Sequence, residues 1–148
     1  MIALLQRVTE ASVSIDGKLT AEIGQGLLAL IGVEKGDTAL SCAALLDKLL
    51  AYRMFSDVKG RMNLNLQQVA GGLLLVPQFT LVADTSSGLR PGFSAGAAPA
   101  DASALFNLMV TQATERHAPV GAGVFAADMQ VGLVNDGPVT FWLRVEPA

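Results

Sequence analysis

The sequence predicts a mixed α/β fold in which two helices pack on a largely antiparallel sheet. Alternating apolar residues at the beginning of the chain indicate strands, two later stretches have helical spacing, and short apolar segments close the chain. Strands that flank two helices favour helices packed on one sheet system. A chain of 148 residues has the usual size of one domain, so we expect a single domain over residues 1–148.

The first expected element is a β-hairpin that turns at Asp16-Gly17, because apolar residues alternate before this pair and again up to Ile23. Residues 27–33 follow as a buried strand. Gly24-Gln25-Gly26 superficially matches a dinucleotide-binding loop. Such a loop must open a helix, whereas a strand is expected here, and this context argues against nucleotide binding.

Two helices are expected in the middle of the chain. Asp37 or Thr38 caps the first, which runs to about Tyr52 with an apolar stripe of leucines. The second runs from Ala100 to His117. The residues expected to face inward from it are Leu105, Leu108, Met109 and Ala113.

The segment between the helices contains two features. Residues 53–66 predict a turn between short extended pieces. Residues 73–76 form an apolar strand that runs into Pro77-Gln78-Phe79-Thr80-Leu81, and since Pro77 cannot donate to a ladder, this strand lies at an edge, is bulged or ends there. Gln78 and Thr80 then either face solvent from an edge strand or belong to a site. Residues 84–99 form a long loop, which in a small domain is usually functional or mobile.

Three short strands are expected after the second helix, over residues 123–126, 129–134 and 139–145. The polar segment Asn135-Asp136-Gly137-Pro138-Val139-Thr140 separates the last two. A plain turn explains it, and Gly137-Pro138 is also a plausible cis peptide.

Composition excludes several classes of protein. Hydrophobic residues make up 51% of the chain and charged residues 16%, which excludes intrinsic disorder, while no apolar run is long enough to span a membrane. We expect a soluble protein whose surplus apolar surface is covered by a second copy of the chain. A net charge of −3 excludes a general binder of DNA or RNA. The absence of a secretory signal and the single cysteine, Cys42, predict a cytoplasmic protein.

Few side chains are available for acid–base chemistry. With a single histidine, His117, a metal site of several imidazoles is impossible, and we expect neither a metal nor a cofactor. His117 is expected as a solvated residue in the last turn of a helix, where its positive form suits the helix dipole. Cys42 lies in a helix interior, which argues against a nucleophile. An enzyme built from this chain would therefore need little acid–base machinery.

Motifs spread along nearly the whole chain are shared with a known family. They are Gln6-Arg7-Val8, Gly32-Val33-Glu34-Lys35-Gly36-Asp37, Arg53-Met54-Phe55, Met62-Asn63, Gln78-Phe79-Thr80-Leu81, Gly88-Leu89-Arg90-Pro91-Gly92-Phe93, Asp128-Met129-Gln130-Val131 and Asn135-Asp136-Gly137-Pro138-Val139-Thr140. Together they make the chain resemble the D-aminoacyl-tRNA deacylases, editing enzymes that hydrolyse D-amino acids from tRNA.

The resemblance implies a barrel-like sheet with two main helices and a homodimer whose active sites, at the interface, bind the 3′ end of aminoacyl-tRNA. Gly137 and Pro138, joined by a cis peptide, would enter the partner's pocket, held by Arg7 through backbone carbonyls. Phe125 and Met129 would line the pocket wall, with ordinary core packing as the alternative. The expected catalytic residues are Gln78, Phe79 and Thr80.

A mechanism follows from this resemblance. Main-chain oxygens of Gly137 and Pro138 would reject L-aminoacyl groups by collision while accepting any D side chain, and glycine as well. Backbone N–H groups near Phe79 and Thr80 would stabilise the oxyanion, and a ribose 2′-hydroxyl of the tRNA would assist the attack of water. The alternative is that the Thr80 hydroxyl is the nucleophile, although no adjacent base is visible.

Two residues depart from the family pattern. Pro77 stands where the family usually has serine, and Ala126 where it usually has glycine. A non-catalytic dimer that binds the tRNA end or a small metabolite is therefore the alternative function. Contacts to tRNA are expected from Lys and Arg near the loop over residues 84–99.

Overall fold

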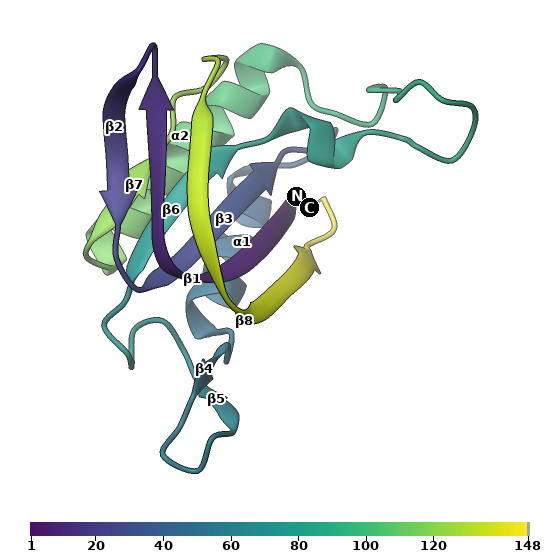
Figure 1. The fold of residues 1–148 in the computed structure, drawn as a ribbon. Coiled ribbons are helices and arrows are strands. Elements are labelled where there is room, and N and C mark those ends of the chain that lie inside the picture. The colour runs from purple at the N-terminus through teal and green to yellow at the C-terminus, as the bar shows by residue number, and fades with distance from the viewer. Residues whose placement is uncertain (148) are drawn as a thin grey trace.

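The computed structural model describes residues 1–147, so that Ala148, the last residue of the expected domain, lies outside the described residues. Its main feature is a strongly bent, barrel-like sheet of six strands with two helices against one face (Figure 1). The strands are β1 (Ile2–Ile15), β2 (Lys18–Ile23), β3 (Gly26–Gly32), β6 (Gly72–Pro77), β7 (Val120–Ala122) and β8 (Gln130–Arg144).

The sheet combines antiparallel and parallel pairs. Its path is β2-β1-β3-β6-β7, and β8 pairs with β1. β1 is antiparallel to β2, β3 and β8, whereas β3 and β6 and then β6 and β7 run parallel. The predicted mixed α/β class is therefore confirmed, and so is the first hairpin.

Apolar side chains from both faces of the central strands are buried. Leu73 and Leu75 of β6 pack toward the helices, while Leu74 and Val76 pack in a second, smaller core. This double burial explains why β3 and β6 read as continuous apolar runs rather than as alternating ones.

The second core exists because β1 and β8 bend together. Their pairing shifts register between Gln6 and Val8 and again between Val8 and Glu10. Such irregularities increase the local twist and bend of a strand pair. Val13 from the far half of β1 consequently reaches the same small core as Val76 of β6.

The helices are α1 (Ala39–Ala51) and α2 (Pro99–Arg116). Thr38 caps α1 by accepting a hydrogen bond from the Leu40 N–H, and Ser41 accepts one from the Thr38 N–H, which completes a capping box. The predicted leucine stripe of α1 is buried. On α2 the predicted Met109 and Ala113 are buried, while Leu105 and Leu108 are half-buried against the core. Phe106, which was not predicted, is buried as well.

Residues 53–66 form a small hairpin of β4 (Phe55–Ser56) and β5 (Met62–Leu64), as the turn signals predicted. The apolar strand β6 ends at Pro77. The next residues form the short 3-10 helix η1 (Phe79–Val82), so the reading of Gln78 and Thr80 as alternating positions of an edge strand is wrong. A proline at the end of the strand removes the next ladder donor and allows the chain to turn.

All three predicted C-terminal strands need correction. Residues 123–126 lie outside the strands, and β7 ends at Ala122 just before them. The other two strands are one continuous strand, β8, because residues 136–139 bulge instead of turning, while Asn135 and Thr140 on either side of them stay paired with β1. None of the helices in residues 1–147 has both the length and the apolar character that a membrane span needs.

Candidate active site

An apolar pocket of about 670 Å³ lies where β3, β6, η1 and the start of α2 meet. The ends of β3 and β6 form one wall, and the segment over residues 125–131 forms another. Of the residues predicted for a site, it contains Gln78, Phe79, Phe125 and Met129. Its remaining lining residues are Ile31, Val33, Val76, Pro77, Val82, Phe93, Gly96, Ala97, Pro99, Ala102, Phe106, Ala126, Ala127 and Val131.

The wall over residues 123–129 packs closely against the end of β6. The Gly123 N–H donates to the Leu75 carbonyl oxygen at 2.8 Å. A Cβ at Gly123 would lie 2.8 Å from the Met129 sulfur and 3.3 Å from the Pro77 Cδ, so a larger residue here would require the Met129 side chain to move. Ala126 has a φ of 66°, in the left-handed region that favours glycine.

The 3-10 helix η1 begins with two backbone N–H groups that precede its first hydrogen bond. Its first hydrogen bond runs from the Leu81 N–H to the Gln78 carbonyl oxygen (3.3 Å), so the N–H groups of Phe79 and Thr80 come before that bond. The Gln78 side-chain amide donates to the Thr80 hydroxyl. Thr80 itself is exposed and does not line the pocket.

Two exposed aromatic rings stand at the pocket. Phe79 and Phe93 are 63% and 43% exposed, and their ring centroids lie 5.2 Å apart in a tilted arrangement. Exposed aromatic faces of this kind are suited to stacking on a nucleobase.

Of the residues that line this pocket in the described chain, none carries an ionisable side chain. Burial, with a smaller contribution from the charge of Asp37, raises the pKa of the Cys42 thiol to about 11, so it stays protonated. His117 is not solvated as predicted, because its Nε2 lies 2.6 Å from the carbonyl oxygen of Gly71 at the opposite end of β6. Residues 1–147 contain no cluster of three metal-ligating side chains.

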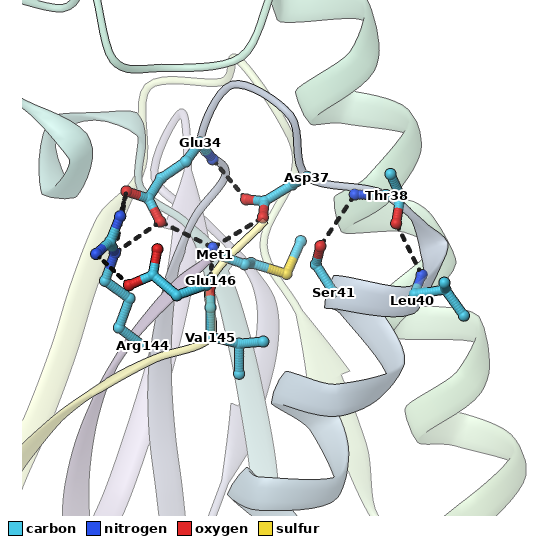
Figure 2. Close-up of polar contacts among 9 residues, drawn as sticks. All are labelled: Met1, Glu34, Asp37, Thr38, Leu40, Ser41, Arg144, Val145 and Glu146. Atoms are coloured by element: carbon cyan, nitrogen blue, oxygen red, sulfur yellow. Dashed lines mark hydrogen bonds and ion pairs between the residues drawn. The ribbon is translucent and has the colours of Figure 1, made fainter. Parts of the chain in front are cut away.

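The N-terminal ammonium group is the centre of a polar network that Figure 2 shows. The Met1 nitrogen donates to Glu34 Oε2 (2.9 Å), Asp37 Oδ1 (2.9 Å) and the Val145 carbonyl oxygen (2.7 Å). Glu34 in turn forms a β-bridge with Gly96, which lines the pocket. The network therefore ties both chain ends to the turn that pairs with Gly96.

The charges in this network favour ionised Glu34. Burial by itself raises the pKa of its carboxyl group, but hydrogen bonds from Arg144 and from the N-terminal ammonium outweigh this and hold the pKa below its ordinary value of 4.5. Arg144 donates to both carboxylate oxygens of Glu34, at 3.0 to 3.2 Å. The sequence shows no sign of this contact because its members are about 110 residues apart.

Arg7, Gly137 and Pro138 form a second group at the bend of β8. Arg7 donates from Nε to the Asp136 carbonyl oxygen (3.1 Å) and from a terminal nitrogen to the Met54 carbonyl oxygen (2.9 Å). The Gly137–Pro138 peptide bond is cis, Gly137 has a φ of 135°, and both residues are exposed. Arg7 thus contacts backbone carbonyls of its own chain.

Asn135 closes this bulge, a role that sequence reasoning missed. Its side-chain nitrogen donates to the carbonyl oxygens of Arg7 (3.1 Å) and Val139 (3.0 Å), and its side-chain oxygen accepts from the Val139 N–H (3.1 Å). An asparagine before a Gly-Pro pair was the available signal, but it equally predicts a turn.

The two groups do not meet within one chain. The strand pairing gives the distance between them. At the pocket, Ile31 of β3 pairs with Pro77 of β6 and with Ala3 of β1. At the β8 bend, Arg7 of β1 pairs with Leu27 of β3. Four residues of strand separate these levels, which is about 13 Å along the sheet. Figure 1 likewise shows the short teal helix η1 and the β8 bend at opposite ends of the sheet.

Comparisons with known proteins extend over the whole chain. A family model described as D-Tyr-tRNA(Tyr) deacylase matches residues 4–144. The chain is 58% identical over 146 residues to the D-aminoacyl-tRNA deacylase of Cellvibrio japonicus, covering 99% of this chain and 100% of that one. It is 59% identical over 145 residues to the enzyme of that name from Erwinia tasmaniensis, covering 98% and 100%.

Two solved structures are also similar. The c-Myc DNA unwinding element binding protein is 33% identical, with a TM-score of 0.94 and coverage of 99% of both chains. A probable eukaryotic D-amino acid tRNA deacylase is 15% identical, with a TM-score of 0.81 and coverage of 96% of this chain and 97% of that one, and it supports the fold alone.

Proposed function

The chain belongs to the D-Tyr-tRNA(Tyr) deacylase family, and from this premise we propose that it is an editing hydrolase that releases D-amino acids, and glycine, from the 3′ end of aminoacyl-tRNA. The observation that carries the proposal is the apolar pocket of about 670 Å³ without ionisable side chains. An aminoacyl ester is already activated, so positioning and backbone donors suffice for its hydrolysis.

The pocket supplies three elements for this substrate. Phe125 and Met129 line the wall that would surround the aminoacyl group. The N–H groups of Phe79 and Thr80 are the donors for the oxyanion that develops on the ester carbonyl. The exposed rings of Phe79 and Phe93 offer a stacking surface for the terminal adenine.

No general base lines this pocket, so we assign the activation of water to the substrate itself. The 2′-hydroxyl of the terminal ribose assists the attacking water, and Thr80 positions the substrate with Gln78, whose amide donates to the Thr80 hydroxyl. A Thr80 nucleophile would need a neighbouring base, and among the hydrogen bonds of residues 1–147 its hydroxyl is paired only with the Gln78 amide, which is no base.

The discrimination between D- and L-aminoacyl groups is assigned to a second subunit. Gly137 and Pro138 are exposed and cannot reach their own pocket, yet Arg7 and Asn135 hold the neighbouring backbone in place. We therefore assign them to the pocket of a partner copy in a homodimer, where main-chain oxygens leave room for the α-hydrogen of a D residue and collide with an L side chain. A main-chain wall selects by exclusion and so accepts any D side chain.

The test is a comparison of D-tyrosyl-tRNA, L-tyrosyl-tRNA and glycyl-tRNA as substrates. Free D-tyrosine and glycine should be released and L-tyrosine retained. Binding of D-tyrosyl-tRNA without release of D-tyrosine would contradict the proposal and favour the non-catalytic dimer, in which Pro77 in place of serine has ended turnover.

The role of the ribose is tested separately. Thr80→Ala should retain substantial turnover, whereas D-tyrosyl-tRNA with a 2′-deoxy terminal ribose should be inert. The opposite pattern would identify Thr80 as the nucleophile.

A further inference from the structure

The chain carries a concentrated positive charge far from its own pocket. Residues 48–61 include four of the ten lysine and arginine residues and one acidic residue, in a chain whose net charge is −3. We call Lys48, Arg53, Lys59 and Arg61 the basic cluster. All four side chains are exposed, and within residues 1–147 none of them forms an ion pair.

The β4–β5 hairpin presents this cluster in a defined arrangement. Arg53 donates to the Asn63 side-chain oxygen (3.2 Å), which ties the start of the hairpin to β5. At the tip, one carboxylate oxygen of Asp57 accepts from the backbone N–H groups of Lys59 and Arg61, at 2.9 and 3.0 Å. The one acidic residue is therefore engaged with the backbone of the tip, and the two cations beside it project into solvent.

An aromatic hollow continues the cluster onto α1. Lys48, Tyr52, Arg53 and Phe141 line it, and the rings of Tyr52 and Phe141 lie 5.5 Å apart. Exposed cations beside an aromatic surface suit a polyanion that also offers flat rings, and RNA has both properties.

From this arrangement we propose that the basic cluster binds backbone phosphates of the tRNA substrate. The inference rests on the proposed function, and it moves the expected tRNA contacts away from the loop over residues 84–99. Arg90 is the only cation of that loop, and Asp84 balances its charge.

The geometry also decides which pocket the cluster serves. Arg7 joins the two features, because one guanidinium contacts the carbonyl oxygens of Met54, next to Arg53, and of Asp136, next to Gly137. The hairpin projects from the same end of the molecule as the β8 bend, opposite η1 (Figure 1). A tRNA whose 3′ end lies in one pocket is therefore held by the basic cluster of the subunit that contributes Gly137 and Pro138 to that pocket.

The first test compares two double variants with the same change in net charge. Lys59→Gln/Arg61→Gln removes two cations from the tip of the β4–β5 hairpin. Lys18→Gln/Lys35→Gln removes two exposed lysines elsewhere, neither of which forms an ion pair with a described residue, and is the matched control. Affinity for uncharged tRNA is measured by fluorescence anisotropy over a range of salt concentrations, so this readout does not depend on catalysis.

The hairpin variant should bind tRNA at least about fivefold more weakly. The slope of log Kd against log salt concentration should also be smaller by about 1.5 to 2, as expected when two phosphate contacts are lost. The control should bind like the wild type. Equal weakening of both variants, no weakening, or a loss seen only with Arg90→Gln would overturn the proposal.

A minimal substrate separates this inference from the proposed function. The ester of D-tyrosine with adenosine carries no phosphate, so its hydrolysis reports on the pocket alone. If the wild type fails to hydrolyse this ester and D-tyrosyl-tRNA, the proposed function is wrong, while the anisotropy result still decides whether the cluster binds tRNA.

Mixed dimers test the assignment to the partner's pocket. One subunit carries Lys59→Gln/Arg61→Gln and an intact pocket, and the other carries Ala127→Trp, or Met129→Trp if the first does not fold, to fill its pocket. The one open pocket should show the KM of the wild type for D-tyrosyl-tRNA, because the intact cluster lies on the other subunit. A KM raised to that of the hairpin variant would show that each cluster serves its own pocket.

Discussion

Ala126 is held in a backbone conformation that suits glycine better than alanine. Its φ is 66°, whereas the neighbouring Ala127 has no positive φ. An L residue in the left-handed region costs about 1–2 kcal/mol, and glycine loses about 0.4–1 kcal/mol through the greater freedom of the unfolded chain. We therefore expect Ala126→Gly to raise the free energy of unfolding by about 0.5–1 kcal/mol, measured by urea denaturation.

Ala127→Gly is the control for this prediction. The same change at an ordinary φ should lower the free energy of unfolding by about 0.5–1 kcal/mol. The two substitutions must therefore differ in sign, and a loss of stability in both would show that the strain at Ala126 is relieved by its surroundings.

Glu34 couples stability to pH through its contacts with Arg144 and the N-terminal ammonium. A carboxyl group whose pKa is lower in the folded state stabilises the fold above its unfolded pKa, here 4.5, and this contribution is lost as the pH falls through the folded value. Glu34→Gln should destabilise the protein by about 1–3 kcal/mol at pH 7 and by progressively less below pH 4.5. Denaturation of the wild type and Glu34→Gln at pH 7, 5 and 3 measures how far the difference between their free energies of unfolding shrinks.

An exposed glutamate without an ion pair in the described chain, Glu10, provides the comparison. Glu10→Gln should change stability little at any of these pH values. If Glu34→Gln lost the same free energy at pH 3 as at pH 7, the Glu34 carboxylate would not be the group that responds to acid.

Individual site residues could be predicted only where the residue type stood out from its neighbours in the sequence, and not where its role depends on contacts with distant residues. Gln78 and Thr80 stood out as a polar pair that interrupts an apolar strand, and the structure places Gln78 at the pocket, whereas Thr80 is exposed and does not line it. The function of Asn135 depends on Arg7, which is 128 residues away, and on a bulge that no local pattern specifies. The left-handed conformation of Ala126 could not be predicted from an alanine.

The start of α1 depends on Thr38, one of the two capping residues that the sequence predicted, and on a capping box that it forms with Ser41. Thr38 accepts a hydrogen bond from the Leu40 N–H, and the side chain of Ser41 accepts one from the Thr38 N–H. Thr38→Ala should lower the free energy of unfolding by about 1 kcal/mol, while Thr38→Asp should retain most of it, because aspartate also caps helices. Thermal unfolding of the wild type and the two variants ranks their stabilities. Equal losses of stability in Thr38→Ala and Thr38→Asp would exclude a capping role for Thr38.

Elements with strong local signals were predictable, and those set by tertiary pairing were not. The first hairpin, β3 and both helices follow from turn residues and periodicity. β8 runs through residues 135–140 because β1 is long enough to pair on both sides of the bulge, which is a property of its partner. The inward face of α2 was predicted incompletely for a similar reason, since the position of the sheet also brings Phe106 inward.

At the scale of the whole molecule, the proposed function requires two copies of the chain, because the pocket and the β8 bend lie at opposite ends. The surplus of apolar residues that composition revealed is visible on the outer face of the sheet. Trp142 is 56% exposed there, and it pairs across the strands with Leu4, which pairs with Leu30. Leu4 and Leu30 are both half-buried. A contiguous apolar stripe of this kind is typical of an interaction surface, and we assign it to the interface of the proposed homodimer.

We therefore expect Trp142→Glu to convert the dimer into a monomer in sedimentation velocity and to abolish deacylation of D-tyrosyl-tRNA, because a buried, unpaired carboxylate opposes association. Leu19→Glu is the control, since Leu19 is 57% exposed on β2, away from this stripe, and its variant should stay dimeric and active. Circular dichroism distinguishes a folded monomer from an unfolded chain. A folded monomer that still hydrolyses D-tyrosyl-tRNA and spares the L form would mean that one subunit judges chirality alone, which the separation of Gly137 from its own pocket does not allow.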